Sequence, residues 1–174
     1  MEFLDQFRID LKAVEDVEER HYDVTDEFFA ALDTPEVSRG KVAVDLQIRK
    51  VAGAFELLFH TEGTVVVACD LCLDDMDQPI DSDNQLLVKL GQENSEDDEL
   101  IVVDENEGIL DTAWFIYEFI ALAIPIRHVH APGKCNAAMT ETLKKLSATR
   151  SGNGDDTQTM DPRWGKLREL NITD

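Results

Sequence analysis

The sequence is poor in cations and in cysteine. Its 174 residues include 16 lysines and arginines against 37 aspartates and glutamates, which gives a formal net charge of −21. This charge opposes non-specific binding of RNA or DNA, which depends on cations that replace counterions at phosphates. The acidic bulk is expected to attract basic partners instead. With only three cysteines, an odd number, and 43% apolar residues, the chain is expected to bury an ordinary core without a disulfide framework.

Long apolar runs and familiar catalytic motifs are also missing. The longest apolar run, "TAWFIYEFIALAIP" at 112–125, is too short to cross a bilayer and contains Glu118. The N-terminal residues lack the basic and apolar regions of a signal peptide. There is no G-x-S-x-G, no P-loop and no G-x-G-x-x-G. We therefore expect a soluble cytoplasmic protein that is not an enzyme, with no membrane association, no small-molecule substrate and no catalytic residues.

Alternating apolar residues predict a series of strands joined by short turns. "AG" at 52–53 and "TEG" at 61–63 are predicted turns, and Thr25 is predicted to cap a short helix that ends before Pro35. The predicted strands are 6–11, 41–50, 54–60, 64–69 and 79–90. Short turns between them favour an antiparallel arrangement. The predicted fold class is α+β: an antiparallel β-meander, either barrel-like or a strongly twisted sheet, packed by one apolar helix and followed by short C-terminal helices.

The second half of the chain, within one domain spanning 1–174, is predicted to carry the helices. Asp111 and Pro125 bound the apolar helix, whose side chains leave little polar face and so suit packing on a sheet. Further helical stretches are predicted at 136–146 and 161–170. An acidic loop at about 91–108 contains a short apolar segment, "LIVV", that can add an edge strand. A polar stretch at about 147–159 is predicted to be a flexible loop.

Cys69 and Cys72 form a Cys-x-x-Cys motif at the end of an apolar run, and three interpretations are open. A redox dithiol needs a lowered thiol pKa, which the neighbouring aspartates would disfavour. A zinc knuckle needs two more ligands, and "IPIRHVHAPGKCN" at 124–136 offers His130 and Cys135. The third interpretation is that Cys69 is a core residue in phase with Val67, and that the other cysteines are unligated.

Three segments together resemble one known family. They are the meander ending in "CDLCLDDMDQPI", the apolar helix ending in "IPIRHVHAPGKC", and the closing "DPRWGKLREL", and they make the chain similar to the YceD-like family of large ribosomal RNA subunit accumulation proteins. The resemblance implies a role in accumulation or maturation of large-subunit ribosomal RNA. Many relatives hold several cysteines after the apolar helix, whereas this chain has only Cys135 there. The implied structural zinc site would therefore be Cys69, Cys72, His130 and Cys135.

The charge is unevenly distributed along the chain. Residues 1–126 hold 8 lysines and arginines against 31 acids, whereas residues 127–174 hold 8 against 6. We expect the acidic body to engage a basic ribosomal protein and the C-terminal part to approach large-subunit ribosomal RNA or its precursor. An acidic protein-binding adaptor without RNA contact and a small thiol or metal enzyme are the alternatives. The candidate RNA- or partner-binding residues are Arg127, Lys134, Lys144, Lys145, Arg163, Lys166 and Arg168.

Overall fold

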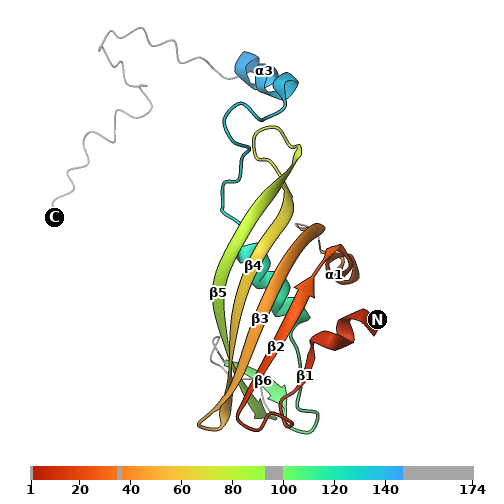
Figure 1. Ribbon diagram of the computed structural model, residues 1–174, viewed down its shortest axis with the longest axis vertical. Coiled ribbons are helices and arrows are strands. Elements are labelled where there is room, and N and C mark those ends of the chain that lie inside the picture. The colour runs from red at the N-terminus through yellow and green to blue at the C-terminus, as the bar shows by residue number, and fades with distance from the viewer. Residues whose placement is uncertain (1, 35–36, 93–99, 147–174) are drawn as a thin grey trace, which may run out of the picture.

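The computed structural model describes residues 2–34, 37–92 and 100–146. Long, strongly twisted strands give the molecule an elongated shape (Figure 1). No helix among the described residues is long and apolar enough to cross a membrane. The elements in chain order are η1 (Glu2–Phe7), β1 (Arg8–Asp10), β2 (Val17–Val24), α1 (Asp26–Leu32), β3 (Arg39–Val51), β4 (Ala54–Ala68), β5 (Asp75–Gly91), β6 (Leu100–Asp104), β7 (Ile109–Asp111), α2 (Ala113–Leu122) and α3 (Ala137–Leu146).

Five strands form one sheet in the order β2-β3-β4-β5-β6, and β1 pairs with β7 in a separate ladder. Strands β2, β3, β4 and β5 pair successively in antiparallel, which confirms the predicted antiparallel arrangement, whereas β6 joins β5 in parallel. The strand predicted at 6–11 is wrong as a member of this sheet, because those residues form the end of η1 and the short β1, which pairs with β7. Among the described strands the sheet is open, so the barrel-like alternative is wrong and the twisted sheet is right. The segment "LIVV" supplies β6 as an edge strand. Strand β2 was not predicted, because its highly charged sequence shows apolar alternation only at its end.

One predicted turn is present and the other is wrong. Ala52 and Gly53 take positive φ values of 44° and 86° and connect β3 to β4. The expected turn at 61–63 is instead the middle of β4, where Gly63 lies opposite Val42. A Cβ at position 63 would lie 2.4 Å from the carbonyl oxygen of Lys41. Glycine is therefore needed there because the backbones of β3 and β4 approach closely, and not because the chain reverses.

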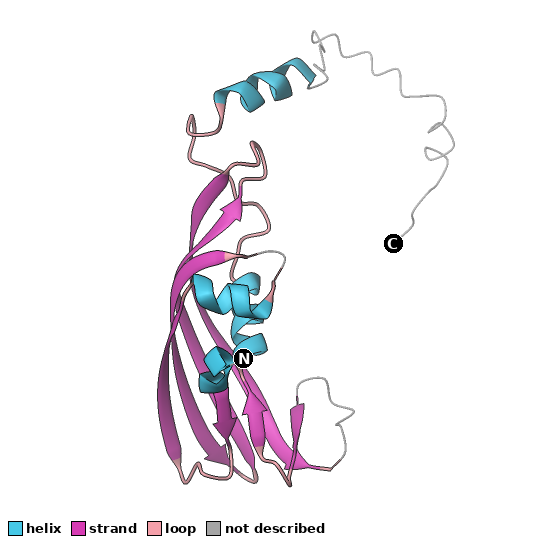
Figure 2. Cartoon of the chain, turned by 90° about the vertical axis from the view of Figure 1, so that its right-hand side faces the viewer, coloured by secondary structure: helices cyan, strands magenta, loops and turns pink. Residues whose placement is uncertain are grey.

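The core lies between one face of the sheet and the helices, as Figure 2 shows. Strands β3 and β4 direct alternate side chains inward, and α2 covers them, with the rings of Phe59 and Phe119 5.1 Å apart. Phe7 from η1 and Phe28 from α1 meet with ring centroids 5.0 Å apart at the adjoining part of the core. Trp114 of α2 is half exposed, although the helix carries little polar face. The opposite face of the sheet is covered by no described helix.

The helix ends follow local sequence signals. The Asp111 carboxylate accepts a hydrogen bond from the N–H of Ala113 at 3.0 Å, and α2 ends three residues before Pro125. Thr25 precedes α1 as expected, but its hydroxyl makes no capping bond, and its backbone carbonyl accepts from Phe28 instead. The loop predicted at 147–159 and the helix predicted at 161–170 lie outside the described residues, as does part of the acidic loop at 91–108.

Candidate metal centre

The tip of the β4–β5 hairpin, residues 69–74, folds into a tight knuckle. The N–H of Cys69 donates to the carbonyl of Asp74, and the N–H of Leu73 donates back to the carbonyl of Cys69, both at 2.9 Å. The N–H of Leu71 points at the sulfur of Cys69 from 3.4 Å. Leu73 takes a positive φ of 62° to close the turn. Cys69 and Cys72 are both buried at this tip.

The coil that follows α2 brings the second pair of candidate ligands to the knuckle. The N–H of Asp70 donates to the carbonyl of His128 at 3.0 Å, and the N–H of His128 donates to the Asp70 carboxylate at 2.8 Å. The side chain of Asn136 donates to the Asp74 carboxylate at 3.1 Å. These bonds hold the coil on both sides of His130 and Cys135. The sequence offered these two residues as ligands but did not show that they reach the knuckle.

The four candidate ligand atoms converge. The sulfurs of Cys69 and Cys135 lie 3.9 Å apart, and Nδ1 of His130 lies 3.4 Å from the sulfur of Cys72 and 3.9 Å from that of Cys135. All four ligand atoms lie within 4.8 Å of one another. In a tetrahedral zinc site, bond lengths of about 2.3 Å to sulfur and about 2.0 Å to nitrogen place two sulfurs about 3.8 Å apart and a sulfur and a nitrogen about 3.5 Å apart.

This geometry suits a closed metal site. Three sulfurs and one nitrogen are a donor set that zinc uses in structural sites, and four protein ligands leave no position for a substrate. The cluster could therefore hold a metal ion such as zinc. If Cys69 and Cys72 were simply apolar core residues, their burial would be explained, but the convergence of their sulfurs with His130 and Cys135 would not.

The thiols of the cluster differ in acidity. Burial raises the pKa of Cys69, but N–H groups of Cys72, His130 and Leu71 face its sulfur and together lower the pKa to about 6. Burial and the nearby sulfurs of Cys69 and Cys72 raise the pKa of Cys135 to about 11. The first thiolate therefore forms easily and the next does not, because negative charge accumulates. A divalent cation removes that penalty, since it stabilises several thiolates at once.

The expectation that neighbouring aspartates disfavour a thiolate at Cys69 is wrong. Their carboxylates bind elsewhere: Asp70 to the N–H of His128, Asp74 to Asn136 and Asp75 to Arg39. The backbone N–H groups of the knuckle, whose direction cannot be read from residue types, set the local potential instead. A low thiol pKa is also what a metal ligand requires, so the value does not by itself favour redox chemistry.

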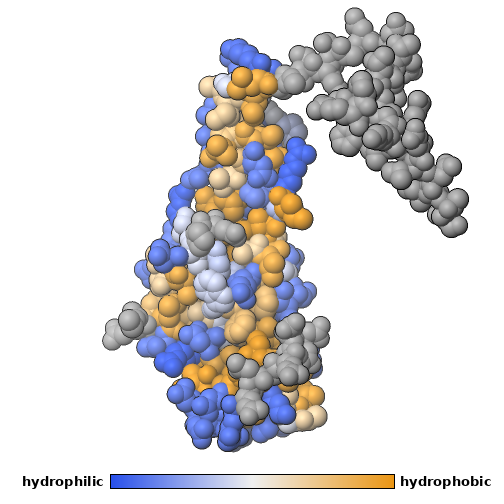
Figure 3. All heavy atoms as spheres, turned by 180° about the vertical axis from the view of Figure 1, so that it is seen from behind, coloured by the Kyte–Doolittle hydropathy of each residue, from blue (hydrophilic) through white to orange (hydrophobic). Residues whose placement is uncertain are grey.

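The predicted RNA- or partner-binding residues within the described chain lie at the same end of the molecule as the cluster. Arg127 and Lys134 are exposed on the coil, and Lys144 and Lys145 belong to α3, where Lys145 lies 3.8 Å from Glu141. Lys144 lines a hollow together with His130 and Cys135. Apolar side chains also gather at this end (Figure 3), where Leu73, Ile126 and Leu146 are among the exposed residues. Arg163, Lys166 and Arg168 lie outside the described residues.

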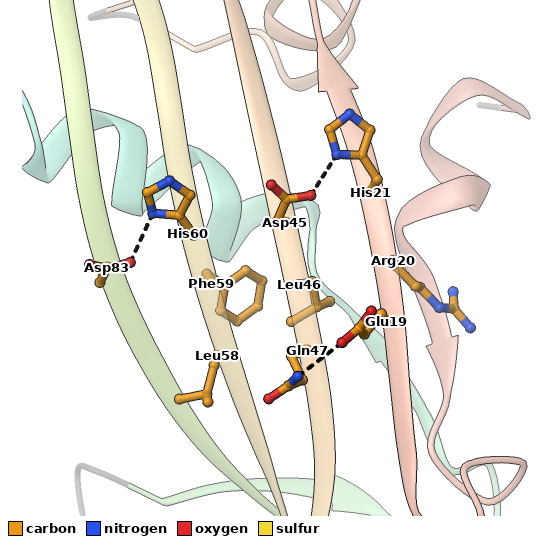
Figure 4. Close-up of a pocket in the computed structure, with 10 residues that line it drawn as sticks. All are labelled: Glu19, Arg20, His21, Asp45, Leu46, Gln47, Leu58, Phe59, His60 and Asp83. Carbon is orange, nitrogen blue, oxygen red and sulfur yellow. Dashed lines mark hydrogen bonds and ion pairs between the residues drawn. The ribbon is translucent and has the colours of Figure 1, made fainter.

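Sequence reasoning missed a row of histidines and aspartates on the uncovered face of the sheet. His21, Asp45, His60 and Asp83 lie side by side on β2, β3, β4 and β5. Nδ1 of His21 lies 2.7 Å from the Asp45 carboxylate, and Nδ1 of His60 lies 2.9 Å from that of Asp83. Figure 4 shows these side chains around a hollow that Leu58 also lines.

Each aspartate of this row acts on one histidine. The hydrogen bond to Asp45 raises the pKa of His21, and the hydrogen bond to Asp83 raises that of His60. One part of the row could have been found from the sequence: Asp45 and His60 are equally far from the turn at 52–53, so a hairpin places them opposite each other. The positions of His21 and Asp83 beside this pair depend on the β2–β3 and β4–β5 registers, which the sequence does not specify.

The fold and the cluster together define an α+β protein with an open, twisted, mainly antiparallel sheet whose central hairpin carries a Cys₃His cluster at its tip. The model of one family, described as "Large ribosomal RNA subunit accumulation protein YceD", matches residues 57–171, and the chain belongs to this family. No curated protein and no solved structure matches the chain. The matched range contains both halves of the cluster, and family membership implies a role in the accumulation of large-subunit ribosomal RNA.

Proposed function

We propose that this protein is a non-enzymatic factor in ribosome biogenesis that supports accumulation or maturation of large-subunit ribosomal RNA by binding a ribosomal protein, the RNA or both. The observation that carries the proposal is the family match over residues 57–171. The closed donor set of the Cys₃His cluster supports it, because such a cluster is suited to holding segments together and not to turning over a substrate.

In this proposal, Cys69, Cys72, His130 and Cys135 hold a structural zinc ion. The ion fastens the coil after α2 to the tip of the β4–β5 hairpin. Helix α3 has no buried residue, so packing against the core contributes little to its position. The cluster thereby sets where α3 and the residues after it project from the body of the protein.

The division of charge suggests how the two ends act. The acidic body engages a basic ribosomal protein, and the basic residues of the C-terminal part approach ribosomal RNA. Within the described chain, Arg127, Lys134, Lys144 and Lys145 would make the RNA contacts, and Arg163, Lys166 and Arg168 would add to them. Each phosphate that is neutralised steepens the dependence of binding on salt by about 0.7–0.9 units of log–log slope.

Co-sedimentation with large-subunit precursors tests the proposal. The wild type is expected to co-sediment, and reversing two charges in α3 (Lys144→Glu with Lys145→Glu) is expected to weaken the association. A control with the same change in charge is Lys41→Glu with Lys89→Glu, since both lysines are exposed on the sheet far from α3 in the sequence. Normal co-sedimentation of the α3 variant would show that α3 is not the contact, and absence of wild-type co-sedimentation would contradict the proposed function.

The uncovered sheet face favours a second candidate, the acidic adaptor that binds protein without touching RNA. Three neighbouring cross-strand rows on this face, centred on the His21–Asp83 row, contain six carboxylates and two histidines but no lysine or arginine. Such a surface repels phosphate. A salt-sensitive complex with a basic ribosomal protein, together with no binding of ribosomal RNA fragments, would favour this candidate over the first.

Zinc content tests the proposed metal separately. Untagged wild-type protein should carry about one zinc per chain, and Cys135→Ser should lose it because a hydroxyl is a poor replacement for a thiolate ligand. Thr142→Ser, on α3 and outside the cluster, is the control and should retain the metal. Wild-type protein that binds no zinc when all its thiols are reduced would contradict the structural role.

A further inference from the structure

The outer strand β5 leaves much of its backbone edge unpaired. Its residues Asp75–Val88 pair with β4 along one side, but β6 pairs with the other side only at Leu87–Gly91. Figure 1 shows β5 at the margin of the sheet with β6 beside only its lower end. Among the described residues, no strand pairs with the free side from Asp75 to Leu86. The coil after α2 makes its cross-chain backbone bond to Asp70 of the knuckle and not to β5.

This free edge carries a regular pattern of charge. Asp75, Asp77, Asp81 and Asp83 occupy alternate positions and are all exposed on the uncovered face of the sheet. Pro79, the residue missing from the aspartate series, has no N–H to donate, and such a residue is tolerated in an edge strand. Aspartates and a proline in an edge strand discourage pairing with a second copy of itself, because like charges opposite one another are destabilising.

The aspartates of this edge, unlike Pro79, favour a strand of opposite charge. An extended segment that pairs with β5 places alternate side chains on the uncovered face, directly beside the aspartates. Lysine or arginine at alternate positions would then meet the carboxylates of Asp75, Asp77, Asp81 and Asp83, with a gap at Pro79. The unpaired N–H and C=O groups of β5 supply the main-chain hydrogen bonds that strand addition uses. RNA has neither the backbone donors nor the positive charge that this edge requires.

The other margin of the sheet does not offer an equivalent site. Figure 1 places η1, β1 and α1 next to β2. The guanidinium of Arg20 on β2 reaches across this margin and donates to the carbonyl of Arg8 at 3.3 Å. Only Glu19 and Asp23 on β2 continue an acidic pattern on the uncovered face, with His21 between them.

We propose that the free edge of β5, Asp75–Leu86, accepts an extended protein segment with lysine or arginine at alternate positions, which joins the sheet as an added strand. The inference rests on the proposed function only in taking the partner to be a basic ribosomal protein; the recognition itself follows from the unpaired edge and its aspartates.

The test uses two end-blocked twelve-residue peptides of equal composition. One alternates lysine and threonine, and the other has the lysines in one block and the threonines in the other. Affinity for the full chain is measured by titration calorimetry at pH 7 and low salt. The alternating peptide should bind about tenfold more tightly, because only it can place lysines beside Asp75, Asp77, Asp81 and Asp83 at once while extended.

Two double variants identify the site. Asp77→Lys with Asp81→Lys reverses charge on β5, where both side chains are exposed. Glu19→Lys with Asp23→Lys makes the same change in charge on β2. The β5 variant should weaken binding of the alternating peptide about tenfold more than the β2 variant does. Hydrogen exchange supplies a second measurement, since amides at 80–86 should slow on binding while those of β2 should not.

Equal affinities for the two peptides, or equal losses from the two variants, would overturn the inference and leave only a general attraction between opposite charges. Circular dichroism establishes that both variants fold; if the β5 variant does not, Asp77→Asn with Asp81→Asn replaces it, against Glu19→Gln with Asp23→Asn. A failed peptide test with normal co-sedimentation would refute the edge site alone. Specific peptide binding without co-sedimentation would support the edge site and refute the proposed function.

Discussion

Removing the metal should free one segment of the chain and leave the sheet intact. Ile124 packs against the core, so the coil from Ile124 to His130 is a short loop whose far end is held at the knuckle. Closing a loop of about six residues costs about 1.6 kcal/mol of chain entropy. The two hydrogen bonds between Asp70 and His128 return about 1–3 kcal/mol together. Without a metal, the attachment is therefore stable by at most about 1.5 kcal/mol.

A metal changes this balance strongly. At a free zinc concentration about a thousand times the dissociation constant, binding stabilises the attached state by about 4 kcal/mol. The amides of Asp70 and His128 are both hydrogen-bonded across the attachment, so each reports on its opening. Their hydrogen exchange should slow about a thousandfold in zinc compared with a chelator. Amides of Val44 and Thr61 in the middle of the sheet are the internal control and should change little.

The assay is hydrogen exchange read by NMR on the full chain, with Cys135→Ser as a variant that should exchange like the chelated protein. Equal exchange of Asp70 and His128 with and without zinc would refute the reasoning, because the cluster would then not hold the coil. Faster exchange of Val44 and Thr61 in chelator would refute it differently, by showing that the cluster supports the whole sheet.

Other parts of the sheet give further expectations. The raised pKa values of His21 and His60 mean that the folded state favours their protonated forms. The two histidines therefore stabilise the fold fully below about pH 6.5, and this stabilisation is lost as the pH rises through their folded pKa values. Urea midpoints across this range should show that trend, and Asp83→Asn should reduce it; an unchanged trend would contradict the role of the row. Gly63→Ala should lower the free energy of unfolding by about 1–3 kcal/mol, because its methyl group would overlap the β3 backbone. The exposed neighbour variant Thr64→Ala should stay within about 0.5 kcal/mol of wild type in the same urea titration.

The hairpins of the fold were more predictable than its strand limits. Residues 52–53 form a two-residue turn between two segments of alternating apolar and polar residues. That local signal is enough to predict the pairing of β3 with β4. Gly63 gave a similar local signal, but the close approach of two backbones, and not a turn, requires it. The pairing of β1 with β7 joins residues about a hundred positions apart, and no local pattern encodes such a contact.

The candidate metal centre was predictable because each half carries its own local motif. Cys69 and Cys72 lie in one turn, and His130 and Cys135 lie in one coil, so only the meeting of the two halves depended on tertiary structure. The acidity of Cys69 was not predictable, since it follows from the direction of backbone N–H groups. The charge pattern of β5 is plain in the sequence, but its free edge becomes visible only once β6 is seen to pair with five residues.

The β4–β5 hairpin connects the acidic edge of β5 with the coil and helix α3, which carry Arg127, Lys134, Lys144 and Lys145. The cluster at its tip joins the hairpin to the coil that leads to α3. The free edge of β5 begins directly after that tip, at Asp75. From Asp75 to Asp81 the strand advances about 20 Å at about 3.3 Å per residue. Charges at the surface are screened over about 8 Å at physiological ionic strength. In the proposed arrangement, the carboxylates around Asp81 would therefore act on a basic protein segment with little effect on phosphates near α3, whereas Asp75 and Asp77 lie closer to the tip. One hairpin can in this way hold a ribosomal protein along its edge and an RNA near its tip, provided that the cluster keeps α3 in place.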